Sequence, residues 1–355
     1  MTIKTASTHK KWLPKHGQWV HFTHRDNMKR KRPMAKASLP KTVPATTLPV
    51  DCTGNATVSC PMLGNDQYGD CGPVMCAHMD EIRTYGQGKA GFAEQSVNQT
   101  ALVAQYEKVS GGDNGTDEDM LVGAQGIWTA AGGGLAGDPT AVVGDHLDVD
   151  ITDIDLAQYL IDQFYGICMA WSVPDAFIQG FAQGTVWPNA AAPDPANGHY
   201  TCQADVAGES VVDGVNIFGF YRLWTWGAWC WVSPAFVESV QPQSFATFSA
   251  LQFNKATGYD SHGRHVSDQA AAWVAIGGNA AAVAAIVSQF PPKVAPTPAP
   301  TPTPAPPSPT PTAPPTLLEA QSAVASALNA LDPLIAKADA EKAAVSALVP
   351  LWPAS

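Results

Sequence analysis

The residue with the clearest capacity for chemistry is Cys71, which lies in the glycine-flanked segment 64–78, GNDQYGDCGPVMCAH. Pro73 is tolerated only in the first turn of a helix, and apolar residues at helical spacing continue from there until Gly86. Cys71 is therefore expected at or just before a helix N-terminus, where the dipole and the backbone amides favour the reactive thiolate. The same amides can donate hydrogen bonds to an oxyanion. The alternative is an inert core thiol.

A nucleophilic thiol needs a base, and His199 is the candidate because it opens an apolar segment of strand-like composition. The alternative for a histidine at a strand edge is an ordinary surface residue. The remaining histidines suit the role less well. Those before residue 25 lie in a basic arm, His78 is on the packed face of the Cys71 helix, and His262 and His265 fall in a polar loop.

The elements that would position these residues follow in the order helices, then strands. The expected helices are one opened by the capping box Ser96–Gln99 ahead of Leu102 and Tyr106, one at 120–131, and one opened by Thr152 with Asp155 that runs through Phe164 to Gly166. The expected strands are 167–173, 199–206, 211–220 and 221–226. An Ala-rich helical piece at 270–287 packs on the core rather than spanning a membrane. This order predicts an α+β domain.

The order of elements resembles that of the papain-like cysteine peptidases and, distantly, of the bacteriocin-processing peptidases that share their fold. The segment GNDQYGDCG before a helix is similar to the family's oxyanion-residue, loop and nucleophile-helix segment. Residues 163–170, QFYGICMA, resemble its helix-glycine-strand unit, and Gly198-His199 resembles the segment with the catalytic histidine. The resemblance covers roughly residues 55–240. It implies a helical subdomain with the nucleophile helix, packed on an antiparallel β subdomain.

The resemblance also implies a role for an amide side chain near Cys71. The family has a glutamine six residues before the cysteine, and this position is Asn65 here, with Gln67 nearby. Both side chains can donate a hydrogen bond to a developing oxyanion. Asn65 is favoured on spacing, and Gln67 is the alternative.

One position departs from the family pattern. Residues 225–227, Thr-Trp-Gly, resemble the family's Ser-Trp-Gly, but the preceding position, where the family has its orienting asparagine, is Trp224. An indole nitrogen only donates, so it cannot accept a hydrogen bond from the imidazole. Either Asp205, Asp213 or Asn216 replaces the asparagine, or the site is a Cys–His dyad, or the scaffold is catalytically degenerate.

Charge and composition divide the chain into four segments. A basic arm, 1–48, precedes a core domain, 49–290, that holds every cysteine; a Pro/Thr/Ala-rich linker, 291–316, precedes a tail, 317–355. The first fifty residues carry eleven Lys or Arg and one acid, whereas the rest of the chain sums to −21. A solvated tail, or an arm that lies along its own acidic domain, is favoured, and nucleic-acid binding is the alternative.

The linker composition favours polyproline II, which would act as a semi-rigid spacer. The tail has an apolar stripe at helical spacing, and we expect it to dock on a partner or to self-associate. No signal peptide is evident in the polar first twenty residues, so cytoplasmic synthesis is expected. Seven cysteines leave at least one unpaired; Cys52 and Cys60 could close a small loop, and no short-spaced zinc motif occurs.

Together these features predict a thiol hydrolase, a papain-like cysteine peptidase or related amide hydrolase acting on a peptide or protein. Cys71 is the expected nucleophile, His199 the base and Asn65 the oxyanion donor, and no metal or organic cofactor is implied. The alternative is a degenerate papain-like scaffold that serves as a binding or structural component of a phage particle or bacterial surface assembly. In that alternative the aromatic stretch 224–231 would be a binding surface rather than core.

Overall fold

The computed structural model describes residues 8–15, 17–23, 43–53, 60–85, 97–110, 112, 128 and 133–293. Helices and an antiparallel-rich sheet share this part of the chain, so the expected α+β class is confirmed. All of it falls within the first of two contact units, Met1–Lys293. The expected helix at 120–131, almost all of the proline-rich linker, and the helical tail with its docking partner lie outside the described residues.

The helices are α1 Cys71–Tyr85, α2 Gln99–Ser110, α4 Ile154–Phe164, α5 Asp175–Gly180, α6 Pro234–Ser239, α7 Val266–Ala275 and α8 Ala280–Val287, with 3₁₀ turns η4 Leu135–Gly137 and η5 Ala250–Gln252. The strands are β1 Thr8–Leu13, β2 Gln18–Thr23, β3 Val143–Val149, β4 Ile167–Ser172, β5 Val186–Trp187, β6 Gly198–Val206, β7 Val211–Val212, β8 Val215–Asn216, β9 Tyr221–Thr225, β10 Ala228–Val232 and β11 Gln243–Ser249.

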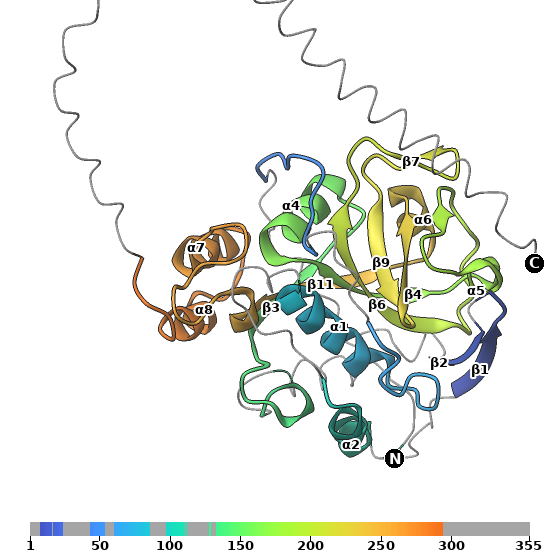
Figure 1. Ribbon diagram of the computed structural model, residues 1–355, viewed down its shortest axis with the longest axis horizontal. Coiled ribbons are helices and arrows are strands. Elements are labelled where there is room, and N and C mark those ends of the chain that lie inside the picture. Colours follow the sequence, from blue (N-terminus) through green and yellow to red (C-terminus); the bar gives the residue numbers. More distant parts are fainter. Residues whose placement is uncertain are drawn as a thin grey trace, which may run out of the picture. The chain divides into compact units, whose positions relative to one another are not determined.

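The central feature of the fold is a sheet of nine strands among the described residues (Figure 1). Seven of them follow the order β3-β11-β4-β6-β9-β10-β5, and β1 and β2 join it through the pairing of β2 with β6. Strand neighbours are antiparallel except for the short pair of β10 and β5. Every residue of β4 and β6 is buried. Close packing on both faces fixes the position of such strands, and β6 carries His199 at its second residue.

Two helices pack on these central strands: α1 contacts β6, β4 and β9, whereas α4 contacts β6, β11 and β4 (Figure 1). Helix α1 begins at Cys71, with Pro73 in its first turn, as the sequence predicts. Its burial is nearly complete from Cys71 to Thr84, so the nucleophile candidate stands on an element without freedom to shift.

A buried polar cluster holds α1 near its C-terminal end. The Arg83 guanidinium donates to Thr247 O at 3.0 Å and lies 3.6 Å from Asp80, and Asp80 accepts from Trp128 Nε1 at 2.7 Å. Burial raises the pKa of Asp80 to about 7, although Arg83 acts in the opposite direction. The contact with Thr247 ties α1 to β11, so the helix is fixed along its axis as well as against the sheet.

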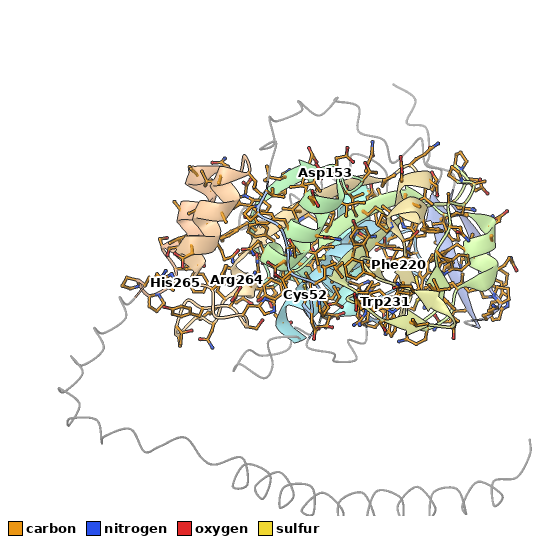
Figure 2. All side chains as sticks on the ribbon, turned by 90° about the horizontal axis from the view of Figure 1, so that it is seen from above. Cys52, Asp153, Phe220, Trp231, Arg264 and His265 are labelled. Carbon is orange, nitrogen blue, oxygen red and sulfur yellow. The ribbon has the colours of Figure 1, made fainter. Side chains whose placement is uncertain are left out.

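Helix α4 is confirmed, but its N-cap is not the predicted residue. Asp153, labelled in Figure 2, accepts from Leu156 N at 3.2 Å, so the helix begins one residue after the expected capping box of Thr152 with Asp155. Thr152 instead hydrogen-bonds to Asp150. At the other end Tyr165 adopts a left-handed conformation before Gly166, in accordance with the expected stop.

Other expectations are refined by the structure. The strand expected at 211–220 is a two-stranded hairpin of β7 and β8, because residues 213 and 214 turn with positive φ. The helical piece at 270–287 is two helices, α7 and α8, separated at Gly277 and Gly278. In Figure 2 the adjacent Arg264 and His265 lie at this end of the molecule, away from Phe220 and Trp231. No described helix is both long and apolar enough to cross a membrane.

The basic arm contributes ordered structure that the sequence did not predict. Strands β1 and β2 form an antiparallel hairpin, and β2 joins β6 through Thr23 and Gly198. Leu13, Val20 and Phe22 are fully buried. Alternation in these short strands sends Leu13, Val20 and Phe22 inward and leaves Trp12 and Trp19 exposed. Because apolar residues fall on both faces, the sequence shows no clear apolar/polar alternation here.

The cap of α4 gives a direct test of these assignments. Asp153→Ala should lower the free energy of unfolding by about 1 kcal/mol, the usual cost of removing an N-cap acceptor, measured by urea denaturation. Thr152→Ala is the matched control and should cost clearly less, since Thr152 hydrogen-bonds only to an exposed aspartate. Equal losses in both variants would contradict the observed cap.

Candidate active site

Cys71 is the first residue of α1 and is 1% exposed. Val74 N donates to Asp70 O at 3.1 Å, which closes the first helical turn over the cysteine. The backbone N–H groups of this turn are directed toward the helix N-terminus, where they favour a thiolate or another anion. The helix start therefore supplies backbone amides that would stabilise a thiolate at Cys71.

His199 lies on β6, opposite Trp171 of β4, and is 2% exposed. Its Nε2 is 2.7 Å from Thr225 Oγ1, and its ring stacks on Trp226 with centroids 4.5 Å apart and planes at 26°. The edge of Phe22 closes another side at 6.0 Å. Burial lowers the pKa of His199 to about 3, and neighbouring His78 acts in the same direction, so the imidazole is neutral near pH 7.

The indole of Trp226 links His199 to Asn65. Trp226 Nε1 donates to Asn65 Oδ1 at 3.1 Å, and Asn65 is 1% exposed. Because an indole only donates, this bond fixes the orientation of the amide. The Asn65 Nδ2 group therefore faces away from the indole and makes two long hydrogen bonds, to Tyr68 O at 3.4 Å and to Asp70 Oδ1 at 3.5 Å.

The structure thus brings Asn65 and His199 together through Trp226, and it brings Asn65 to Asp70, the residue before Cys71. Gln67, the alternative oxyanion donor, is exposed. Cys71 and His199 are not hydrogen-bonded to each other, since His199 Nδ1 has no hydrogen-bond partner among the described residues. Catalytic hydrogen bonds are often long before a substrate is bound.

The residue that orients His199 is Thr225, which the sequence did not identify. Trp224, at the position where the resemblance implies asparagine, packs against Trp229 with centroids 6.2 Å apart, and its indole nitrogen has no hydrogen-bond partner among the described residues. Thr225 directly follows Trp224 in the sequence. Its hydroxyl, next to the position of the missing asparagine, could have identified it as the hydrogen-bond partner of His199. Strand alternation places it on the opposite side of β9 from Trp224.

The three polar candidates between His199 and Trp224 make contacts elsewhere. Asp205 pairs with Arg222 at 3.0 Å and accepts from Cys52 N at 2.6 Å. Asn216 accepts from Phe218 N at 3.0 Å, and Asp213 lies in the exposed turn between β7 and β8. Cys52 and Cys60, considered for a disulfide, are separate buried thiols.

The β1–β2 hairpin covers this group of residues. Phe22 contacts both His199 and Trp226, and His21 N donates to Asn65 O at 3.2 Å. At the other end of the hairpin the Lys11 ammonium lies 2.6 Å from Asp175 and 3.7 Å from Asp194. The low exposure of Cys71 and His199 is that of a covered site.

A surface pocket of about 490 Å³ lies between the outer side of the hairpin and the loop that carries Asn65. Trp12, Trp19 and Lys10 line it from the hairpin, and Met62 and Asp66 line it from the loop. The centroids of the two indole rings lie 5.5 Å apart with their planes at 58°, and the residues are 43% and 52% exposed. The pocket thus lies where the hairpin and the loop meet.

The buried state of His199 predicts a pH dependence of stability. In the unfolded chain the pKa of the histidine is near its ordinary 6.5, and in the folded chain it is about 3. The unfolded state therefore binds the proton first, and the stability that His199 confers above pH 6.5 is lost as pH falls toward 3. Between pH 6.5 and 5 the wild type should lose up to about 2 kcal/mol more than His199→Gln. Denaturant unfolding across this range measures the difference.

The matched control is His262→Gln, which removes an exposed histidine. It should behave as the wild type over the same pH range. If His199→Gln also follows the wild type, the imidazole titrates normally and is not buried as described.

No family model matches the chain, and no curated protein matches it in sequence. Solved structures do match. Xylellain, a cysteine protease from Xylella fastidiosa, is 12% identical with a TM-score of 0.42, over 70% of this chain and 99% of that one. Digestive procathepsin L 3 from Tenebrio molitor is 11% identical with a TM-score of 0.44, over 63% and 77%. The Carica candamarcensis cysteine protease CMS1MS2 is 12% identical with a TM-score of 0.40, over 57% and 100%. Two of these three structures are described as cysteine proteases and the third as a procathepsin.

Proposed function

We propose that this protein is a papain-like cysteine peptidase, or a related amide hydrolase, in which Cys71 is the nucleophile and His199 the base. The observation that carries the proposal is the position of Trp226, which stacks on His199 and fixes the Asn65 amide beside the start of the Cys71 helix. A peptide or protein is the corresponding substrate, since the chemistry is attack on an amide carbonyl.

In the first half-reaction Cys71 Sγ attacks the carbonyl carbon while its proton passes to His199. With Nε2 protonated and donating to Thr225, the lone pair of the neutral ring is on Nδ1, which is the atom available to accept that proton. The oxyanion accepts hydrogen bonds from Asn65 Nδ2 and from the Cys71 backbone amide. The C–N bond then breaks, and His199 returns the proton to the departing amine.

In the second half-reaction water replaces the amine. His199 Nδ1 removes a proton from the water, which attacks the thioester carbon, and the same donors hold the second oxyanion. The C–S bond breaks, the acid leaves and the thiol regains its proton. Two long hydrogen bonds from Asn65 Nδ2 fit this role, because such bonds are readily exchanged for a stronger one to an anion.

The hairpin makes the described conformation a latent one. Substrate cannot reach a cysteine that is 1% exposed, and a histidine whose pKa is about 3 is a weak base. Displacement of β1 and β2 would expose both side chains and return the pKa of His199 toward 6.5. The arm would thus act as a propeptide-like cover, in agreement with its docking on the acidic body through Lys11.

Selective thiol chemistry tests the proposed pair. All seven cysteines are buried, so each can react only when its surroundings open, and the effect of His199→Ala on the Cys71 rate isolates the contribution of the base. Cys71 should react with iodoacetamide faster than the other six below pH 7, as measured by peptide mass spectrometry. His199→Ala should slow it by about 100-fold, a typical contribution of a general base.

Thr225→Val should reduce the Cys71 alkylation rate less than His199→Ala does, because it removes only the orientation of the ring. Thr201→Val is the control: Thr201 lies on β6, and its replacement should leave the rate unchanged. Seven thiols reacting slowly and alike would instead favour the degenerate scaffold. Hydrolysis of an unstructured protein substrate, lost in Cys71→Ser, then separates a peptidase from a merely reactive thiol.

The cover is tested by Phe22→Ala, which removes the ring packed on His199 and Trp226. Truncation of a buried phenylalanine costs about 3–5 kcal/mol, and part of this cost should appear as easier opening of the hairpin. The Cys71 alkylation rate should therefore rise about tenfold or more. Trp12→Ala, on the exposed side of the same hairpin, is the control and should leave the rate unchanged. An equal rise in both variants, or none in either, would contradict a covering role.

A further inference from the structure

A second group of reactive side chains lies on α1 and on the loop that precedes it, and the proposed chemistry does not use it. One nitrogen of His78, Cys60 Sγ and one carboxylate oxygen of Glu81 all lie within 4.8 Å of one another. The three residues are 3%, 0% and 6% exposed, respectively. His78 and Glu81 are three residues apart on α1, which places them on one face of the helix, whereas Cys60 comes from the loop that leads to Asn65.

The hydrogen bond of His78 fixes how its ring can act. His78 Nε2 is 2.8 Å from Pro61 O, and a carbonyl only accepts, so Nε2 carries the proton and Nδ1 the lone pair. A histidine that binds a metal commonly donates its other N–H to a backbone carbonyl in this way.

We propose that Cys60, His78 and Glu81 bind a zinc ion. A thiolate, an imidazole and a carboxylate are the three ligand types that Zn²⁺ accepts together, whereas Mg²⁺ and Ca²⁺ require oxygen ligands. The cation would balance the charges of the thiolate and the carboxylate, which are otherwise costly to bury. A fourth ligand, from the protein or from water, would complete a tetrahedral site.

The position of the site indicates what the ion would do. It would join the loop 60–65 to α1, and that loop is already held at Pro61 by His78 and closed by the bond from Asn65 N to Met62 O at 2.9 Å. Asn65 is therefore held relative to Cys71 through the same helix that supplies two ligands. The role is structural, since the ligands are buried and belong to a helix and a loop packed on the sheet, and it does not depend on the proposed peptidase activity.

Metal content of the full chain, purified without an affinity tag that binds metals, tests the proposal. After removal of metal with a chelator and reconstitution with zinc, the protein should retain about one ion per chain by elemental analysis. Cobalt in place of zinc should give a thiolate-to-cobalt charge-transfer band. Cys60→Ser should abolish that band and weaken zinc binding by on the order of 100-fold or more, because even outer-shell partners are worth 10- to 100-fold.

Three matched variants complete the experiment. Cys230→Ser removes another fully buried thiol and should retain the thiolate-to-cobalt band. Cys71→Ser should also retain this band, and that result would exclude Cys71 as the metal ligand. Glu81→Gln should weaken zinc binding without removing the band. If the wild type retains no stoichiometric zinc, or if Cys60→Ser binds as well as Cys230→Ser, the proposal is wrong. The wild-type cobalt spectrum decides the matter even if a variant fails to fold.

Discussion

The arrangement of the candidate site depends on one side chain, the indole of Trp226. Its face packs on the His199 ring and its N–H holds the Asn65 carbonyl oxygen, so it sets both the plane of the base and the direction of the amide. A single rigid ring does this at little entropic cost, since it has only two rotatable bonds. The backbone at Trp226 has a φ of 50°, a left-handed value that Gly227 follows, and this turn directs the ring toward the loop rather than along β9.

Complete burial is the second constraint, and it has a chemical cost. Dense packing fixes the ring and the amide, but it also keeps His199 neutral by lowering its pKa. The packed hairpin therefore fixes the geometry of the site, whereas a reactive His199 would require the hairpin to be displaced. The proposed displacement of the hairpin would reconcile the two, and it would break the pairing of β2 with β6 at Thr23 and Gly198.

The sequence predicted the elements whose signals are local. Glycine and proline around Cys71 placed the start of α1, and apolar periodicity placed α4, β4 and β6. It did not identify Thr225, because the side of a strand on which a residue falls depends on the register, and the pairing of β6 with β9 shifts between Ala204 and Val206. The hairpin escaped notice because its short strands are stabilised by pairing and burial against the body, which no local pattern reports. The cluster of Cys60 with His78 has a spacing of eighteen residues and no motif.

Helix α1 connects the buried polar cluster, Cys71 and the loop that carries Asn65. Arg83 and Asp80 fix its C-terminal half to β11 and to Trp128, and a helix transmits position along its axis because its hydrogen bonds resist compression. An anchor at Arg83 therefore determines where Cys71 stands, three turns away. The same rigid body carries His78, which holds the loop at Pro61 and through it the main chain of Asn65. The proposed nucleophile and the proposed oxyanion donor are thus both held in place by α1, whereas the proposed base, His199, belongs to the sheet. The distance across which a substrate must fit is then the separation of α1 from β6, which the packing of two buried elements sets.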